Sequence, residues 1–152
     1  MRALLQRVSE ASVTVDGTAV GAIGRGLLIF LGVQNGDDDS RVEATAKKIA
    51  GLRLFEDADG RMNLSNEQVE GGYLVVSQFT LCADLSKGKR PGFDAAMKPP
   101  ESERLYRLFC DRLAALTGRP VRTGTFGATM TVALKNEGPA TFWLEISEGP
   151  SR

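Results

Sequence analysis

The sequence contains no histidine and only two cysteines among its 152 residues. Without histidine there is no Ser-His-Asp or Cys-His triad, no histidine-ligated zinc and no imidazole acid or base. Cys82 and Cys110 stand apart without a C-x-x-C pair, so we expect free packing thiols in a reducing compartment. Any chemistry must therefore use hydroxyls, amides, carboxylates, Lys or Arg, backbone groups or the substrate itself. We expect neither a metal nor a cofactor.

The chain also lacks a long hydrophobic run and an excess of charge of either sign. Its longest apolar stretch, residues 27–33, is too short to cross a bilayer, and residues 1–7 turn polar before a signal-peptide core could form. We therefore expect a cytoplasmic protein with no membrane partner. The 19 basic residues balance 19 acidic ones, which argues against broad electrostatic capture of a nucleic-acid duplex. The balance does not argue against binding the end of a nucleic-acid strand, for which a few local contacts suffice.

The hydrophobic pattern predicts a single α+β domain over residues 1–146 and a disordered segment over 147–152. We expect mostly antiparallel sheet with two main helices on one face. Strands are predicted within residues 1–23 around the turn Asp16-Gly17, and over 27–33, 52–55, 72–81, 121–126, 128–135 and 141–146. Helices are predicted near 39–51 and from Pro99-Pro100-Glu101 to Gly118.

The first candidate site is Ser77-Gln78-Phe79-Thr80, at the polar end of a predicted core strand. Ser and Thr hydroxyls are weak nucleophiles without a base nearby, and no histidine exists to serve as one. One interpretation is a strand edge whose polar groups satisfy backbone partners. The functional interpretation is a positioning site in which backbone N–H groups form an oxyanion hole.

Three further segments have both a plain and a functional interpretation. Gly138-Pro139 reads as a hairpin turn, but a cis bond there would aim carbonyl oxygens in one direction, as a receptor for an ammonium group. Residues 87–90, Lys-Gly-Lys-Arg, are either solvated surface or a phosphate contact for a nucleic-acid strand. Phe126 and Met130 pack in the core, line an apolar pocket or stack on a base.

Two of these segments resemble the signatures of a known family. Residues 77–84, SQFTLCAD, closely resemble the SQFTLYAD signature of the D-aminoacyl-tRNA deacylases, and residues 136–141, NEGPAT, resemble their NxGPVT signature, the Gly-cisPro motif. The similarity covers nearly all of residues 1–146, in the family's order. Cys82 stands where tyrosine is usual and Ala140 where valine or isoleucine is common.

The resemblance implies a homodimer, barrel-like in its sheets, that hydrolyses the ester between a D-amino acid and the 3′ end of tRNA. Gly138-Pro139 would be cis, enter the partner subunit's pocket, hold the substrate's amino group and leave no space for an L side chain. Arg7 would brace this motif, and Ser77, Gln78 and Phe79 would line the site. Thr80 matches a residue once favoured as nucleophile, whereas the prevailing family view gives activation to the tRNA 2′-OH. Glycyl-tRNA(Ala) would also be cleaved.

Two other functions compete with this interpretation. One is an editing module related to those of archaeal threonyl-tRNA synthetases, which remove wrongly attached L-serine, but the D-selective Gly138-Pro139 motif is retained here. The other is a non-catalytic module that binds aminoacyl-tRNA or a small amine, which the missing conventional base favours. Turnover of D-aminoacyl-tRNA separates the enzyme from the binding module.

Overall fold

The computed structural model describes residues 1–147; residues 148–152, and with them most of the predicted disordered segment, lie outside the described residues. The elements are β1 (Arg2–Val15), β2 (Thr18–Ile23), β3 (Gly26–Gly32), α1 (Asp39–Ala50), β4 (Phe55–Glu56), β5 (Met62–Leu64), β6 (Gly72–Ser77), the 3-10 helix η1 (Phe79–Cys82), α2 (Glu101–Thr117), β7 (Val121–Thr123) and β8 (Thr131–Glu145). No helix among the described residues is both long and apolar enough to cross a membrane.

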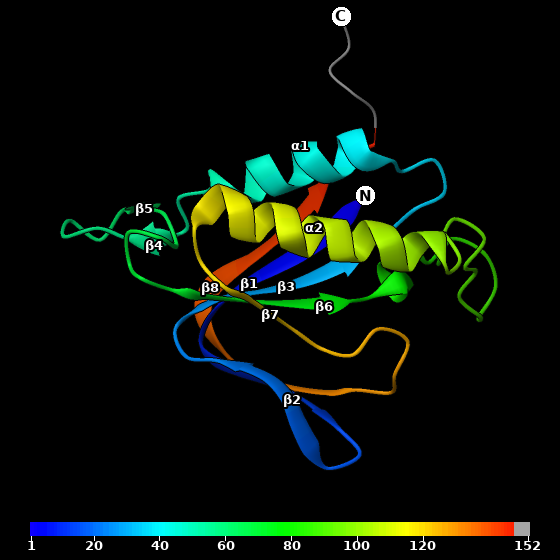
Figure 1. Ribbon diagram of the computed structural model, residues 1–152, viewed down its shortest axis with the longest axis horizontal. Coiled ribbons are helices and arrows are strands. Elements are labelled where there is room, and N and C mark those ends of the chain that lie inside the picture. Colours follow the sequence, from blue (N-terminus) through cyan, green and yellow to red (C-terminus); the bar gives the residue numbers. More distant parts are fainter. Residues whose placement is uncertain (148–152) are drawn as a thin grey trace, which may run out of the picture.

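One mixed sheet carries the fold, with both helices on one of its faces (Figure 1). Its strand order is β2-β1-β3-β6-β7, and β8 pairs with β1. β1 is antiparallel to β2, β3 and β8, whereas β6 runs parallel to β3 and to β7. Strands β4 and β5 form a separate antiparallel pair. The predicted α+β class, with two main helices on one face of a mostly antiparallel arrangement, is confirmed.

The two predicted helices begin and end where their capping residues stand. The Asp38 carboxylate accepts a hydrogen bond from the backbone N–H of Arg41 and caps α1. Gly118 ends α2 in the left-handed conformation, at φ +66°. The apolar stripes of both helices pack on the sheet in one buried cluster, to which they contribute Val42, Ala46, Ile49, Leu105, Phe109 and Leu113.

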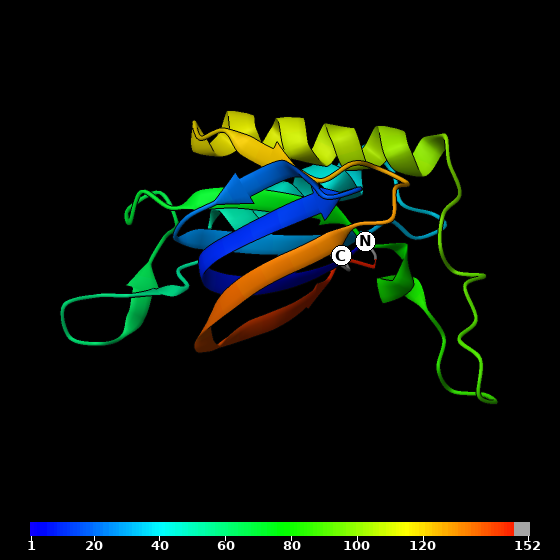
Figure 2. The same cartoon turned by 90° about the horizontal axis from the view of Figure 1, so that it is seen from below.

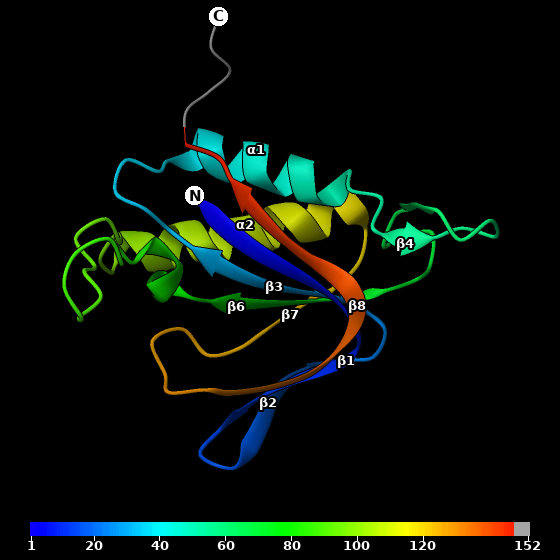
Figure 3. The ribbon, with the colours of Figure 1, turned by 180° about the vertical axis from the view of Figure 1, so that it is seen from behind.

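The long strands β1 and β8 bend, so that their distal halves and β2 fold over the face of the sheet that the helices leave open (Figure 3). A second buried cluster fills this fold, built from Val8, Ala11, Val13, Leu28, Leu74 and Val76. The result is a nearly barrel-like arrangement with a core on each face of the central strands β3 and β6.

Two predicted strands are shorter than expected. The strand expected over 72–81 ends at Ser77, and η1 follows. The β3–β6 ladder ends at the pair Leu31–Ser77, and beyond it only the N–H of Gln78 bonds to the backbone of β3 before the chain turns into η1. The strand expected over 52–55 is reduced to Phe55–Glu56, because only these residues pair with β5.

The C-terminal strands also differ from the prediction. The strand expected over 121–126 stops at Thr123, and the separate strands expected over 128–135 and 141–146 are one strand, β8. Gly138-Pro139 therefore does not form a hairpin turn between strands. β1 is long enough to pair with β8 on both sides of these two residues, which bulge out of the ladder.

Candidate active site

The SQFT segment lines a pocket of about 520 Å³ at the carboxyl end of β6. The other walls come from the segment after β3, from the loop that precedes α2 and from the segment that leads into β8. The lining residues are Val33, Val76, Ser77, Gln78, Phe79, Phe93, Ala96, Met97, Lys98, Pro99, Ser102, Phe126, Gly127, Ala128, Met130 and Val132. Apolar walls with a few polar groups are typical of a small-molecule site.

Parallel pairing of β6 with β3 brings the SQFT segment to the pocket. The backbone N–H of Gln78 donates to the carbonyl of Leu31 at 2.8 Å, one residue beyond the last ladder pair. The chain then turns into η1, which leaves Phe79 55% exposed at the pocket edge. Its ring meets that of Phe93 edge-on, with 5.1 Å between ring centroids. Phe79 is thus held as part of a wall rather than as free surface.

Two backbone N–H groups beside this wall have no intramolecular acceptor. They belong to Phe79 and Thr80, the first residues of η1, and no hydrogen bond from either is found among the described residues. The first N–H groups of a helix lack an intrahelical partner and are free to bind an anion or a developing oxyanion. They are the kind of free backbone donor that the oxyanion-hole interpretation of this segment requires, and that role stays a prediction.

Thr80 itself is exposed and is not among the described residues that line the pocket. Its hydroxyl oxygen accepts a hydrogen bond from the side-chain amide of Gln78. An amide cannot remove a proton at neutral pH, and no carboxylate or amine hydrogen-bonds Thr80 among residues 1–147. The geometry therefore supplies no base to activate this hydroxyl.

Phe126 and Met130 both pack in the core and line the pocket, whereas stacking on a base stays a prediction. The Phe126 ring packs 5.7 Å from that of Tyr106, whose hydroxyl donates to the carbonyl of Val75, and Met130 packs against the second core. Both residues also line the pocket. Gly124 makes room for Met130, since a Cβ there would lie 2.6 Å from the Met130 sulfur. The pocket wall is thus anchored in both cores.

Lys98 is the only ionisable side chain among the described lining residues, and Ser77, Gln78 and Ser102 are the remaining polar ones. Within residues 1–147, no three His, Cys, Asp or Glu side chains gather closely enough to hold a metal ion. The chemistry available inside the pocket is therefore that of hydroxyls, an amide, backbone N–H groups and one ammonium.

Gly138-Pro139 stands on a bulge of β8 opposite Arg7. Between the pairs Gln6–Thr141 and Val8–Asn136, one residue of β1 faces a four-residue segment of β8, residues 137–140. The Gly138–Pro139 peptide bond is cis, as the resemblance implied. Both residues are exposed at the tip of the bulge, whereas Ala140 behind them is fully buried.

Arg7 and Asn136 hold the base of this bulge. The side-chain amide of Asn136 donates to the carbonyls of Arg7 at 3.0 Å and Ala140 at 3.2 Å, and so bridges its two ends. The guanidinium of Arg7 is buried, donates to the Leu54 carbonyl at 2.8 Å and places its Nε 3.6 Å from a carboxylate oxygen of Glu137. Arg7 thus contacts the bulge through its guanidinium at Glu137 and through its backbone carbonyl at Asn136, and its bracing role stays a prediction.

The bulge lies far from the pocket of its own chain. Arg7 is in register with Leu27 and Tyr73, so Ser77 lies four residues further along β6, about 13 Å at strand spacing. β8 and β6 are also separated by β1 and β3, which adds about 14 Å across the sheet. The structure therefore brings Ser77, Gln78, Phe79, Phe126 and Met130 together, and leaves Gly138-Pro139 and Arg7 apart from them.

Many of the lining residues are absent from the sequence-based prediction, among them Phe93, Met97 and Ser102. Phe93 and Met97 lie in a loop without periodicity, and Met97 reaches the pocket because its backbone N–H donates to the carbonyl of Val33. Ser102 is a buried polar residue in the first turn of α2. An aromatic residue in an otherwise polar loop was the one signal in the sequence that could have pointed to Phe93.

The family model described as D-Tyr-tRNA(Tyr) deacylase matches residues 4–145. The chain belongs to this family. It is 59% identical over 145 residues to the D-aminoacyl-tRNA deacylase of Dinoroseobacter shibae, which covers 95% of this chain and 99% of that protein. It is 55% identical over 146 residues to the D-aminoacyl-tRNA deacylase of Aeromonas hydrophila, covering 96% of this chain and all of that one.

A solved structure is also similar over its full length. It is that of a c-Myc DNA unwinding element binding protein, which superposes with a TM-score of 0.91 at 40% identity and covers 97% of this chain and all of that one. Curated relatives of this deacylase family are enzymes of the hydrolase class, and the fold described above is theirs.

Proposed function

We propose that the protein hydrolyses the ester bond of D-aminoacyl-tRNA and releases the D-amino acid and tRNA. The observation that carries this proposal is the pocket at the SQFT segment, in a chain that matches D-aminoacyl-tRNA deacylases over nearly its whole length. Its apolar walls suit the terminal base, and the free N–H groups of Phe79 and Thr80 suit the ester carbonyl.

The reaction we propose is assisted by the substrate. Water attacks the ester carbonyl, the bond to the 3′ oxygen breaks, and that oxygen leaves with a proton as the ribose hydroxyl. The 2′-OH beside it can direct the water and relay the proton. The protein holds the ester against the N–H groups of Phe79 and Thr80, which stabilise the oxyanion. This route needs no side-chain base, which agrees with a pocket whose only ionisable lining residue is Lys98.

The active unit we propose is a homodimer in which Gly138-Pro139 of one chain completes the pocket of the other. The separation of the bulge from its own pocket supports this, because one chain cannot bring the two together without unfolding its sheet. A row of apolar side chains on one face of the sheet also supports the homodimer. Trp143, Leu4 and Phe30 are paired neighbours across β8, β1 and β3, on the face away from the helices, and Trp143 is 51% exposed.

Chirality follows from this arrangement. Carbonyl oxygens at the exposed bulge would accept hydrogen bonds from the substrate's ammonium group while the ester is held at η1. With both groups fixed, exchanging the Cα substituents drives an L side chain into the backbone of Gly138-Pro139. Glycine has no side chain to reject, so the same filter admits glycyl-tRNA(Ala).

The test compares hydrolysis of D-tyrosyl-, L-tyrosyl- and glycyl-tRNA by the purified protein, with Pro139→Ala alongside. We expect cleavage of the D and glycyl esters only, and weaker discrimination in the variant, because its bulge tip presents a smaller barrier. Equal cleavage of D and L esters would leave an esterase without a chirality filter. Inert glycyl-tRNA beside cleaved D-tyrosyl-tRNA would contradict steric exclusion as the whole filter.

A second candidate is a non-catalytic module that binds a nucleic-acid end. It draws on the absence of histidine and on the 40% identity to a protein named for binding a DNA element. Binding of D-aminoacyl-tRNA without turnover would favour the module, and turnover removes it. A cytoplasmic location belongs to the enzymatic proposal, because aminoacyl-tRNA is consumed there.

A further inference from the structure

A loop rich in basic residues extends from the edge of the pocket. This basic loop, residues 84–98, begins two residues after η1 and ends at Lys98, which lines the pocket. Backbone hydrogen bonds between Asp84 and Gly92 close its outer part, and the N–H of Met97 ties its end to the carbonyl of Val33. Figure 2 shows this yellow-green segment reaching away from the helices and the sheet. The loop is thus anchored at the pocket and projects from it.

The outer part of the loop carries cations without compensating acids. Lys87, Lys89 and Arg90 are exposed, and no carboxylate lies within ion-pair distance of them among residues 1–147. The loop contains two acids, Asp84 and Asp94, and neither forms an ion pair among residues 1–147. Hydrogen bonds from the Ser86 side chain and from the Ser86 backbone N–H stabilise the charged form of Asp84 and lower its pKa. That carboxylate is therefore engaged by the loop's own backbone.

Many basic residues elsewhere on the surface are paired with acids, although Lys48, Arg61 and Arg122 have no carboxylate within ion-pair distance among residues 1–147. Arg2 pairs with Glu145 across β1 and β8, Lys135 pairs with Glu10, and Arg107 pairs with Glu103 along α2. In a chain with 19 residues of each sign, the basic loop differs from the rest of the surface because Lys87, Lys89 and Arg90 bring three unpaired cations into four residues. Because the net charge of zero gives the molecule no overall attraction for a polyanion, we expect a nucleic acid to bind at this loop.

We infer that the basic loop binds the phosphate backbone of the tRNA acceptor stem while the aminoacyl end occupies the pocket, an inference that rests on the proposed function. Phosphate contacts from Lys and Arg orient a nucleic acid without reading its sequence. Such a contact gives a deacylase affinity for every tRNA while the pocket reads only the amino acid. The loop is therefore a sequence-independent docking element for the substrate.

The reach of the loop fits this role. Lys87 lies six residues from Phe93, whose ring contacts Phe79 at the pocket edge. An extended chain of that length spans up to about 20 Å. Successive phosphates of a duplex strand are only a few ångströms apart along its axis, so this span covers several nucleotides. Cations at the tip can therefore reach phosphates beyond the terminal nucleotide.

The test uses the triple variant Lys87→Ala, Lys89→Ala, Arg90→Ala and two substrates. One is D-tyrosyl-tRNA, and the other is the D-tyrosyl ester of adenosine, which has no phosphate. We expect kcat/KM for the tRNA to fall at least tenfold at low salt, and its logarithmic salt slope to fall by about 2. Hydrolysis of the adenosine ester should be unchanged. The matched control, Lys47→Ala, Lys48→Ala, Arg61→Ala, removes three exposed cations from α1 and the β4–β5 region, and should keep the parent slope.

A direct binding measurement separates this inference from the proposed activity. A fluorescent RNA hairpin of an acceptor stem ending in CCA should bind the parent and the control variant equally, and the loop variant at least tenfold more weakly. An unchanged affinity or salt slope in the loop variant overturns the inference, even if the enzyme is active. An equal loss on the adenosine ester also overturns it, because the loop would then serve the pocket. Weakened RNA binding in a protein that hydrolyses neither ester supports the inference and rejects the deacylase.

Discussion

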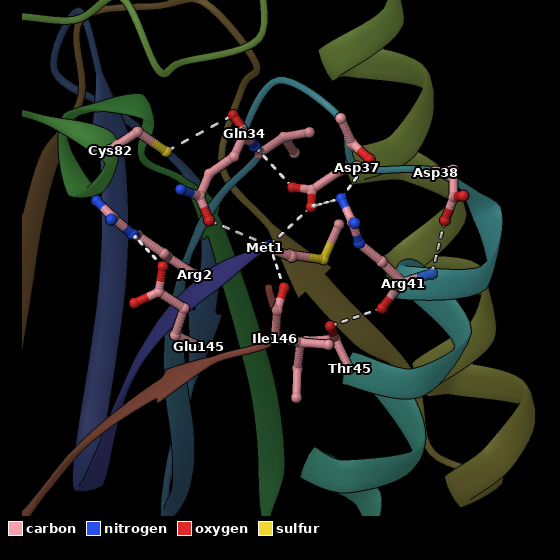
Figure 4. Close-up of polar contacts among 12 residues, drawn as sticks. Met1, Arg2, Gln34, Asp37, Asp38, Arg41, Thr45, Cys82, Glu145 and Ile146 are labelled. Carbon is pink, nitrogen blue, oxygen red and sulfur yellow. Dashed lines mark hydrogen bonds and ion pairs between the residues drawn. The ribbon is translucent and has the colours of Figure 1, made fainter. Parts of the chain in front are cut away.

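The α-ammonium group of Met1 lies 2.8 Å from the Asp37 carboxylate, and both groups are buried. The same ammonium donates to the carbonyl of Ile146 at 2.7 Å and to the Gln34 side chain at 3.3 Å (Figure 4). The second carboxylate oxygen of Asp37 accepts from the backbone N–H of Gln34 at 2.7 Å. This ion pair therefore joins the start of β1 to the end of β8 and to the segment that leads into α1.

Replacing Asp37 with Asn should lower stability substantially. Asn keeps the shape of the side chain but leaves the Met1 ammonium buried without a counter-charge, a loss of about 3 kcal/mol for such pairs. Urea unfolding followed by circular dichroism measures it. Asp39→Asn is the control, because Asp39 pairs with Arg104 in solvent, and its unfolding midpoint should be nearly that of the parent. Equal midpoints for the two variants would show that the buried pair contributes little.

Cys110 should be unreactive in the folded protein. Burial raises the pKa of its thiol from 9.0 to about 12, and burial also raises the pKa of Cys82. The thiolate is the reactive form, so an alkylating reagent at pH 8 should label neither residue until the chain is unfolded. Mass spectrometry of labelled native and unfolded protein gives the comparison. Rapid labelling of either cysteine in the native state would contradict the prediction.

The same shift predicts a loss of stability in alkali. Because the folded pKa of Cys110 lies above its unfolded value, the buried thiol contributes fully to stability below about pH 8.5. That contribution is lost as the pH rises toward 12, the folded value. In Cys110→Ser, which does not titrate in this range, the decline of the unfolding midpoint between pH 8.5 and 11 should be shallower. Parallel declines in the two proteins would assign the alkaline loss to other groups.

Trp143→Arg should separate the two subunits of the proposed dimer. The ring lies on the face of the sheet away from the helices and is 51% exposed, so the substitution should leave the monomer folded. We expect a monomer by light scattering and at least a tenfold loss of D-tyrosyl-tRNA hydrolysis, because the pocket then lacks the Gly138-Pro139 bulge. Met62→Arg, at a 43% exposed position on β5, is the control. A parent protein that is active as a monomer would refute the dimer.

The helices were predictable because their signals are local. An apolar stripe, an acidic cap and a terminal glycine lie within the segment itself, as at Asp38 and Gly118. The single long strand β8 was not predictable, because every local sequence rule predicts a turn at Gly138-Pro139. Its distant partner β1 continues the pairing on both sides of the bulge, and that information lies more than a hundred residues away.

In the candidate site, too, the features with a local signal were predictable and those set by distant contacts were not. Ser77, Gln78, Phe79, Phe126 and Met130 were identified from residue type and from the resemblance, and they meet in one pocket, which Thr80 does not line. Phe93 was missed because its position depends on a loop tied to the end of β3 through Met97 and Val33. The separation of Gly138-Pro139 from the pocket likewise follows from sheet register, which no motif records.

Thr80→Ala should retain most of the activity, whereas removing the substrate's 2′-OH should not. Among residues 1–147 only the amide of Gln78 bonds the Thr80 hydroxyl, so the loss of this hydroxyl should lower kcat less than tenfold. A D-tyrosyl ester on tRNA ending in 2′-deoxyadenosine should react about 100-fold more slowly, the scale of a lost proton relay. Single-turnover rates on the two substrates are the measurement. A Thr80→Ala protein that binds tRNA normally and has no turnover would restore the threonine as nucleophile.

Asn136→Ala should weaken discrimination between D and L substrates more than it weakens the fold. The Asn136 amide bridges the carbonyls of Arg7 and Ala140, and the two bonds together are worth about 2 kcal/mol. If that energy holds the bulge in place, its loss should reduce the ratio of D to L hydrolysis by about 30-fold. The ratio of kcat/KM for D- and L-tyrosyl-tRNA is the measurement.

Two variants distinguish positioning from general destabilisation in this experiment. Lys135→Ala removes the adjacent side chain, whose exposed pair with Glu10 lies outside the bulge, and should leave the ratio unchanged. Asn136→Asp keeps the size of the side chain but cannot donate to the two carbonyls, so it should resemble Asn136→Ala. A variant that keeps the parent ratio at a temperature well below its melting point would show that Asn136 only stabilises the strand. If discrimination falls in both Asn136 variants and not in Lys135→Ala, the hydrogen bonds from Asn136 to Arg7 and Ala140 determine the selectivity for D over L substrates.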